Sequence, residues 1–79
     1  MKIEQIVSNE YKKELREAEQ NINNASDLDK DIFLDMYISA KEYINATYQN
    51  EPKEYKEVLA LSSANAEYFC YQNKRKNGN

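Results

Sequence analysis

The chain has 79 residues, of which 41% are hydrophobic and 32% charged, and its net charge is −3. A chain this short forms at most one small domain, and its composition is typical of a folded, water-soluble protein without a membrane span. It contains no His, one Cys and one Gly, so one copy cannot build the common zinc sites, most nucleophile and base pairs, or a glycine-rich phosphate loop. We therefore expect no enzymatic activity, no metal and no cofactor.

A first helix is predicted from about residue 2 to residue 22. Its apolar side chains recur at spacings of three and four, which places them along one face of a helix. These side chains are Ile3, Val7, Tyr11, Leu15, Ala18 and Ile22. The Asn-rich segment that follows is typical of a turn, because Asn hydrogen-bonds readily to nearby backbone.

A second helix is predicted over about residues 27–49. The Ser26 hydroxyl can accept a hydrogen bond from the amide of residue 29, and the acidic residues after it suit the positive end of a helix dipole. The apolar arc is wide and comprises Phe33, Leu34, Met36, Tyr37, Ile38, Ala40, Tyr43, Ile44, Thr47 and Tyr48. Because such an arc needs more than one neighbour, we predict that this helix is the central one.

A third helix is predicted over about residues 52–76, since Pro52 disfavours helix before it and fits a first turn. Its predicted core stripe is Tyr55, Val58, Leu59, Ser62, Ala66, Phe69 and Asn73. The many small side chains in its middle indicate either close approach of a neighbouring helix or a break near Ser62 and Ser63. The lack of Gly and Pro there favours close approach.

Three such helices joined by short connections predict an all-α fold, a three-helix up-down-up bundle in a single domain, residues 1–79. The alternative is a two-helix hairpin that pairs with a second copy. One core in a domain of this size rarely supplies more than about 3 to 5 kcal/mol. We therefore expect a protein partner, self-association or both.

Two motifs that suggest chemistry have simpler interpretations. The alternating acids Asp27, Asp29 and Asp31 match the opening of a calcium loop, but that loop calls for Gly and an acid where this chain has Ile32 and Ile38. The acids are therefore interpreted as a solvated helix start. The single Cys, Cys70, is predicted to be a small buried hydrophobic residue in a reducing compartment.

Seven tyrosines are the clearest excess in the composition. Tyr provides large, rigid contact area with a polar tip and is favoured at interfaces, although many boundary positions carry it too. We place Tyr11, Tyr37 and Tyr55 in the core. We expect Tyr48, Tyr68 and Tyr71 to be partly exposed. The basic cluster Lys74, Arg75 and Lys76 lies near two of these, but the acidic net charge argues against direct nucleic-acid binding.

Residues 29–44, DKDIFLDMYISAKEYI, followed by Asn45-Ala46-Thr47, resemble the early helix of the small head-to-tail connector (adaptor) proteins of long-tailed bacteriophages. Residues 58–61 and 71–74 resemble the last helix of the same family. The resemblance implies a helical protein that assembles as a ring beneath the portal and extends the DNA channel towards the tail. It also implies that Tyr71, Asn73 and Lys74 lie near a subunit contact.

Two functions are therefore hypothesised. The first is a non-enzymatic structural protein of phage or prophage origin, a connector acting through helix-face contacts. The second is a small acidic helical inhibitor or adaptor that binds a larger protein and blocks or bridges it. Its acidic face would suit a basic surface on that partner, and nucleic-acid-binding proteins are one class that offers such a surface. We expect the bacterial host cytoplasm for either, or the virion for a connector, and no membrane partner. The candidate partner-binding residues are Asp27, Asp31, Asp35, Glu42, Tyr48, Tyr68, Tyr71, Asn73 and Lys74.

Overall fold

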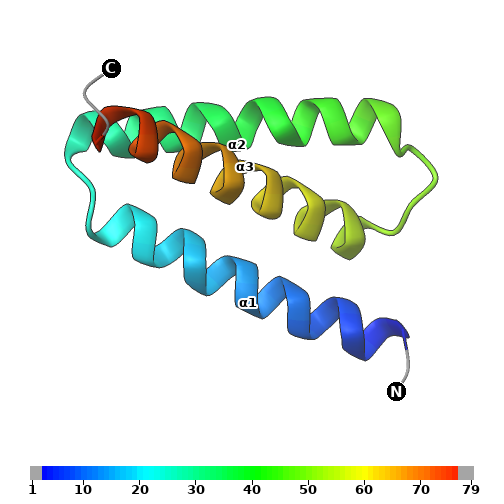
Figure 1. The fold of residues 1–79 in the computed structure, drawn as a ribbon. Coiled ribbons are helices and arrows are strands. Elements are labelled where there is room, and N and C mark those ends of the chain that lie inside the picture. The colour runs from blue at the N-terminus through cyan, green and yellow to red at the C-terminus, as the bar shows by residue number, and fades with distance from the viewer. Residues whose placement is uncertain (1–2, 77–79) are drawn as a thin grey trace.

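The computed structural model describes residues 3–76, and the side chains of residues 8–76. Three helices, α1 (Ile3–Asn23), α2 (Asp27–Thr47) and α3 (Lys53–Lys76), run up, down and up (Figure 1). No strand occurs within these residues. The predicted all-α three-helix bundle is confirmed.

The helix ends follow from local chemistry. The Ser26 side chain accepts a hydrogen bond from the amide of Asp29 at 3.2 Å and caps α2, as predicted. At its other end, α2 stops at Thr47, two residues before the predicted end at about residue 49. The next residue, Tyr48, has the non-helical backbone angles φ −116° and ψ 53°. The Pro52 carbonyl accepts the first hydrogen bond of α3, from the amide of Lys56 at 3.1 Å.

The helix α3 is continuous and lies at the centre of the bundle, which corrects the prediction that α2 is central. It packs along both α1 and α2, whereas those two have little contact with each other, and Figure 1 shows α3 crossing between them. Ala60 and Ala64, both 0% exposed, supply the reason. Their small side chains allow neighbouring helices to lie close to α3, and the continuity of α3 from Lys53 to Lys76 excludes the alternative of a break near Ser62 and Ser63.

The core is formed where the three helices meet. Its buried side chains are Ala18 from α1, Phe33 from α2, and Leu61, Ala64 and Tyr68 from α3. Partly buried side chains surround them: Tyr11, Leu15, Ile22, Met36, Tyr37 and Tyr71. The predicted α1 face is confirmed as far as its side chains are described; those of Ile3 and Val7 lie outside that part of the structure.

The predicted core stripe of α3 is wrong. Tyr68 is 1% exposed, whereas Phe69 is 62% and Tyr55 39% exposed, and the inward residues are Ala60, Leu61, Ala64, Asn65 and Tyr68. The helix carries two stripes of similar hydrophobicity, and the one with Ala60, Leu61, Ala64, Asn65 and Tyr68 is the one that faces the two neighbouring helices. On α2, Tyr43, a member of the predicted apolar arc, is 68% exposed.

A polar contact joins α1 to α3 inside the bundle. Asn65 is 3% exposed, and its amide nitrogen donates to the carbonyl of Glu14 at 3.1 Å and to the Glu14 carboxylate at 2.9 Å. Asn21 donates to the Asn65 side-chain oxygen at 3.2 Å. A buried amide satisfied in this way specifies how α1 lies along α3.

Candidate protein-binding surface

Four of the predicted partner-binding residues lie together on the outward side of α2. Asp27, Asp31, Asp35 and Glu42 are all exposed, and their spacings of four, four and seven place them along one side of a helix. The buried residues of α2 lie on the opposite side, where Phe33, Ala40 and Ile44 meet the core. The structure thus presents these four acids on one continuous face.

Two aliphatic side chains lie among these acids. Leu34 is 49% exposed and Ile38 is 47% exposed, and each is three or four residues from an acid of the set. They formed part of the wide apolar arc that predicted two neighbours for α2. Because α2 packs mainly on α3, these side chains have no second helix over them. We call the surface formed by these acids and the two aliphatic side chains the α2 outer face. Its residues are Asp27, Asp31, Leu34, Asp35, Ile38 and Glu42.

The charged side chains of the α2 outer face are all negative, and the nearest lysines, Lys30 and Lys41, are each placed against an acid. Lys30 reaches Asp27 only at 4.0 Å, and Lys41 is bound to the Glu57 carboxylate at 2.9 Å. Among the side chains described, Asp31, Asp35 and Glu42 therefore have no ion-pair partner. Exposed carboxylates without partners attract a cationic surface over several ångströms and repel an acidic one.

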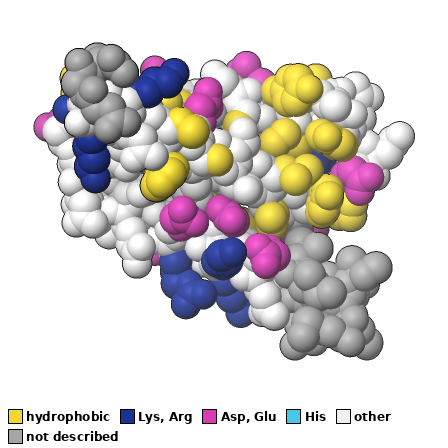
Figure 2. Space-filling model, in the orientation of Figure 1, with side chains coloured by type: hydrophobic (Ala, Val, Ile, Leu, Met, Phe, Trp, Pro, Cys, Tyr) yellow, Lys and Arg dark blue, Asp and Glu magenta, His cyan; other side chains and the backbone are white. Residues whose placement is uncertain are grey.

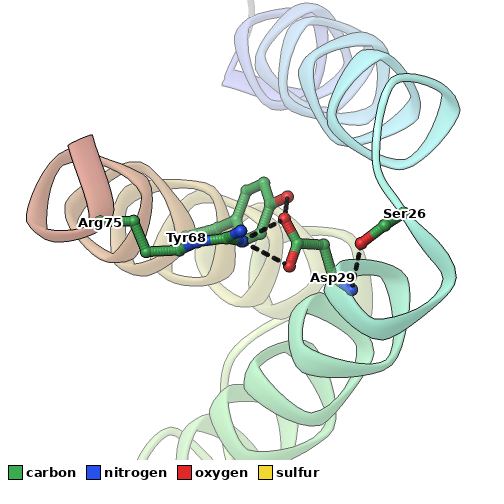
Figure 3. Close-up of polar contacts among 4 residues, drawn as sticks. All are labelled: Ser26, Asp29, Tyr68 and Arg75. Atoms are coloured by element: carbon green, nitrogen blue, oxygen red, sulfur yellow. Dashed lines mark hydrogen bonds and ion pairs between the residues drawn. The ribbon is translucent and has the colours of Figure 1, made fainter.

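Asp29, which sits in the same acidic helix start, points the other way (Figure 3). Residues two apart lie on opposite sides of a helix, so Asp29 faces inwards while Asp27 and Asp31 face outwards. Asp29 is 9% exposed and accepts from the Tyr68 hydroxyl at 3.1 Å and from Arg75 Nη1 at 2.8 and 2.9 Å. The sequence pattern gives no sign of this contact, because helical periodicity does not relate residues so far apart.

Tyr68 was predicted to be partly exposed, and the structure corrects this. Its ring packs edge-on against Phe33, with centroids 5.5 Å apart, and stacks on Tyr71 at 6.0 Å. Burial, and then the hydrogen bond to Asp29, raise the pKa of the Tyr68 hydroxyl above its ordinary 10.0. A side chain fixed in the core in this way is not available to a partner.

The remaining candidates lie at the two ends of the bundle. Tyr71 is half-buried beneath Arg75, whose guanidinium carbon is 5.6 Å from its ring centroid. Asn73 and Lys74 are exposed at the end of α3. Tyr48, 43% exposed, follows α2 at the opposite end. The nine candidates therefore do not form one surface, and the α2 outer face is the largest group.

A second polar cluster joins α2 to α3. The Tyr37 hydroxyl donates to Glu57 at 2.7 Å, and the Lys41 ammonium lies 2.9 Å from the other Glu57 oxygen. Burial raises the pKa of Glu57, but hydrogen bonds from Tyr37 and Lys41 outweigh it and the pKa falls below its ordinary value. Burial and Glu57 raise the pKa of Tyr37. The cluster is an interhelical clamp.

Beside this clamp is a shallow hollow of about 350 Å³ lined by Lys41, Asn45, Lys53, Lys56 and Glu57. Its one acid is already held by Tyr37 and Lys41. General acid and base catalysis needs groups that converge on an enclosed substrate, and this hollow offers mainly lysine side chains. It suits no reaction that we can assign from its residues.

Two further observations concern chemistry at the surface. Cys70 is exposed, which corrects the prediction that it is buried, because it lies next to Phe69 on the side of α3 that faces away from both neighbouring helices. Within the part of the chain that the structure describes, no three acidic or Cys side chains are grouped to hold a metal ion. Over the same residues, none of the helices is both long enough and apolar enough to span a bilayer.

Comparisons with family models, with curated proteins and with solved structures found no match to this chain.

Proposed function

We propose that this protein is a non-enzymatic helical adaptor or inhibitor that binds a basic surface of a larger protein through the α2 outer face. The observation that carries the proposal is the exposure of Leu34 and Ile38, 49% and 47%, within a face whose unpaired charges are all acidic. Apolar side chains supply contact area at the centre of an interface, and charges around them supply attraction and selectivity.

The proposal is supported by the rigidity of the surface. The inward side of α2 is held by the core at Phe33 and by the two polar clusters, Asp29 with α3 at one end and Tyr37 with Glu57 further along. A helix held in place before binding loses little conformational entropy when a partner docks. The face therefore needs no rearrangement to bind.

The charge of the face defines the class of partner. Surfaces rich in Lys and Arg are typical of proteins that bind nucleic acid, because those side chains neutralise phosphates. A face with Asp31, Asp35 and Glu42 offers carboxylates to the same side chains. We accordingly propose a nucleic-acid-binding protein as the partner, which this protein would block or bridge.

The test is capture of a partner from the host lysate, followed by titration with that purified partner. Asp31→Lys with Asp35→Lys should weaken binding at least tenfold and leave the helical circular dichroism unchanged. The matched control is Glu10→Lys with Glu17→Lys, two exposed acids of α1, which changes the net charge equally and should preserve binding. Equal loss in both variants, or none in either, would contradict the α2 outer face as the site.

The second candidate is the head-to-tail connector, which would act by contacts between copies and with a portal. It is supported by the exposure of Asn73 and Lys74 in the last turn of α3, where the family resemblance places a subunit contact. Light scattering tests this candidate directly. A ring of many copies would support the connector, whereas a monomer or dimer that still captures a basic protein would support the adaptor.

A further inference from the structure

The hollow beside the interhelical clamp gathers positive charge in an otherwise acidic protein. Its walls are Lys41 and Asn45 from α2 and Lys53, Lys56 and Glu57 from α3, around a volume of about 350 Å³. Three lysines and one glutamate give these walls a charge of +2, whereas the whole chain has a net charge of −3. The hollow therefore attracts ligands of the sign that the rest of the molecule repels.

The one acid of the hollow does not neutralise Lys53 and Lys56. Both oxygens of Glu57 are already engaged, one by the Lys41 ammonium at 2.9 Å and the other by the Tyr37 hydroxyl at 2.7 Å. Among the side chains of residues 8–76, no ion pair includes Lys53 or Lys56. Two ammonium groups on the α3 wall thus remain available to a ligand.

The other acids at the start of α3 lie outside this wall. Glu51 and Glu54 are exposed, and neither is among the residues that line the hollow. Lys56 is half-buried, as is typical of a lysine whose aliphatic stem lies along the protein while its ammonium reaches solvent. Asn45, on the α2 wall, adds amide donors without adding charge. Donors thus come from two helices, and no unpaired carboxylate opposes them.

We infer that this hollow binds a small phosphate-bearing anion, of the size of pyrophosphate or a phosphate monoester. A cation would be repelled by the unpaired lysines, and a neutral apolar ligand calls for enclosed apolar walls. Phosphate groups accept hydrogen bonds on several oxygens, and lysine is a common partner for them. The volume lies near the lower end of the range of about 300 to 1,000 Å³ found for ligand pockets, which suits a ligand of this size.

The distribution of basic side chains favours a small anion over a nucleic acid. On the side of the molecule drawn in Figure 2, lysine and arginine side chains form separate small groups with acidic side chains between them. Nucleic acid is held by many phosphate contacts along a continuous basic surface, whereas a small anion needs only the few donors of one hollow. No residue of the hollow belongs to the α2 outer face, so this site is distinct from the proposed partner-binding surface.

Titration of the isotope-labelled protein with pyrophosphate, followed by NMR at low salt, tests the site. The amide signals of Lys53 and Lys56 and the side-chain amide of Asn45 should shift and saturate, with half-saturation at about 1 mM or below. Unshifted signals at about 10 mM pyrophosphate would overturn the inference. Shifts of equal size around the exposed lysines of α1 would overturn it too, because they would show binding to any surface lysine.

Two pairs of variants test the residues of the hollow. Lys53→Gln with Lys56→Gln should weaken pyrophosphate binding at least about tenfold, because both unpaired ammonium groups are removed. The matched control is Lys12→Gln with Lys13→Gln, at two exposed positions of α1, which removes the same charge and should preserve binding. Asn45→Asp places a carboxylate in the α2 wall and should also weaken binding, whereas the exposed Asn9→Asp should not. Equal affinities within either pair, with helicity unchanged by circular dichroism, would contradict the site.

Parallel titrations identify the source of the phosphate group. Tighter binding of pyrophosphate than of adenosine monophosphate would assign a free oxyanion, and the reverse order would assign a phosphate ester. Chloride is the reference anion, and chloride that binds as tightly as either would reduce the site to general counterion binding and overturn the inference. The variant with Asp31→Lys and Asp35→Lys should still bind pyrophosphate, so this inference and the adaptor function are tested separately.

Discussion

Asp29 and Arg75 are 46 residues apart in the sequence, yet Arg75 donates to both carboxylate oxygens of Asp29, at 2.8 and 2.9 Å. The same carboxylate accepts from the Tyr68 hydroxyl at 3.1 Å. The first turn of α2 is thereby tied to the last turns of α3. Tyr68 is 1% exposed, whereas the side chain of Arg75 is 57% exposed. Water therefore screens the hydrogen bond between Asp29 and Tyr68 less than it screens the ion pair between Asp29 and Arg75.

Replacing Asp29 with Ala should lower the free energy of unfolding by about 1 to 3 kcal/mol, since the buried Tyr68 hydroxyl loses its acceptor. Urea denaturation followed by circular dichroism measures the change. Asp27→Ala, at an exposed position of the same turn, is the control and should cost less than about 1 kcal/mol. In a double-mutant cycle with Tyr68→Phe, strictly additive effects would contradict the contact.

Replacing Asn65 with Ala should cost about 1 to 3 kcal/mol, because the contacts to Glu14 and Asn21 are lost inside the bundle. Thermal unfolding provides the measurement. The matched control is Asn9→Ala, at an exposed position of α1, with an expected change within about 0.5 kcal/mol. Similar melting temperatures for the two variants would show that the Asn65 contacts contribute nothing to stability.

Replacing Ala64 with Leu should destabilise the bundle by about 1 to 3 kcal/mol, because both neighbours of α3 approach at this 0% exposed position. Ala46→Leu, at an exposed position of α2, makes the same chemical change and should be nearly neutral. The midpoint of urea unfolding distinguishes them. A tolerated Leu at position 64 would argue against close approach of the helices.

Alkaline pH should weaken the fold through Tyr68. Its pKa is raised from 10.0 by burial and by the hydrogen bond to Asp29, so the folded protein holds this proton more tightly than the unfolded chain. The stabilisation is complete below about pH 10 and is lost as pH rises through the raised pKa. The difference in tyrosinate absorbance between wild type and Tyr68→Phe should therefore develop above about pH 10.

The control for this titration is the same difference measured in concentrated urea, where burial and the Asp29 contact are gone. There the pKa of Tyr68 should return to the ordinary value of 10.0. A folded-state difference centred at or below that value would contradict the described environment of Tyr68.

Much of the secondary structure was predictable because its signals are local. Apolar spacing, the Ser26 cap and the Pro52 start each act within one or two helical turns, and the observed helices begin or end within two residues of the predicted bounds. The acidic face of α2 was predictable for the same reason. Asp27, Asp31, Asp35 and Glu42 share one side of any helix that contains them.

The inward side of α3 was not predictable in this way. From the sequence alone, Phe69 is as good a candidate for the core as Tyr68. The side chains of Ser62 and Ala66 are also similar in size to those of Ala60 and Ala64. Which stripe faces inwards depends on the two neighbours between which α3 must fit, and on Asn65 finding its partners on α1. Such requirements join residues more than 40 positions apart, so no window of sequence contains them.

By itself, the sequence determined three helices, their ends and the acidic side of α2, because backbone hydrogen bonding, capping and helical periodicity operate between near neighbours. Only the tertiary structure decided that α3 is central, that Asp29 faces inwards to Tyr68 and Arg75, and that Phe69 and Ile38 remain exposed. The physical reason is that close packing selects among amphipathic faces of similar hydrophobicity by shape and by the pairing of buried polar groups, which exist only once the helices meet.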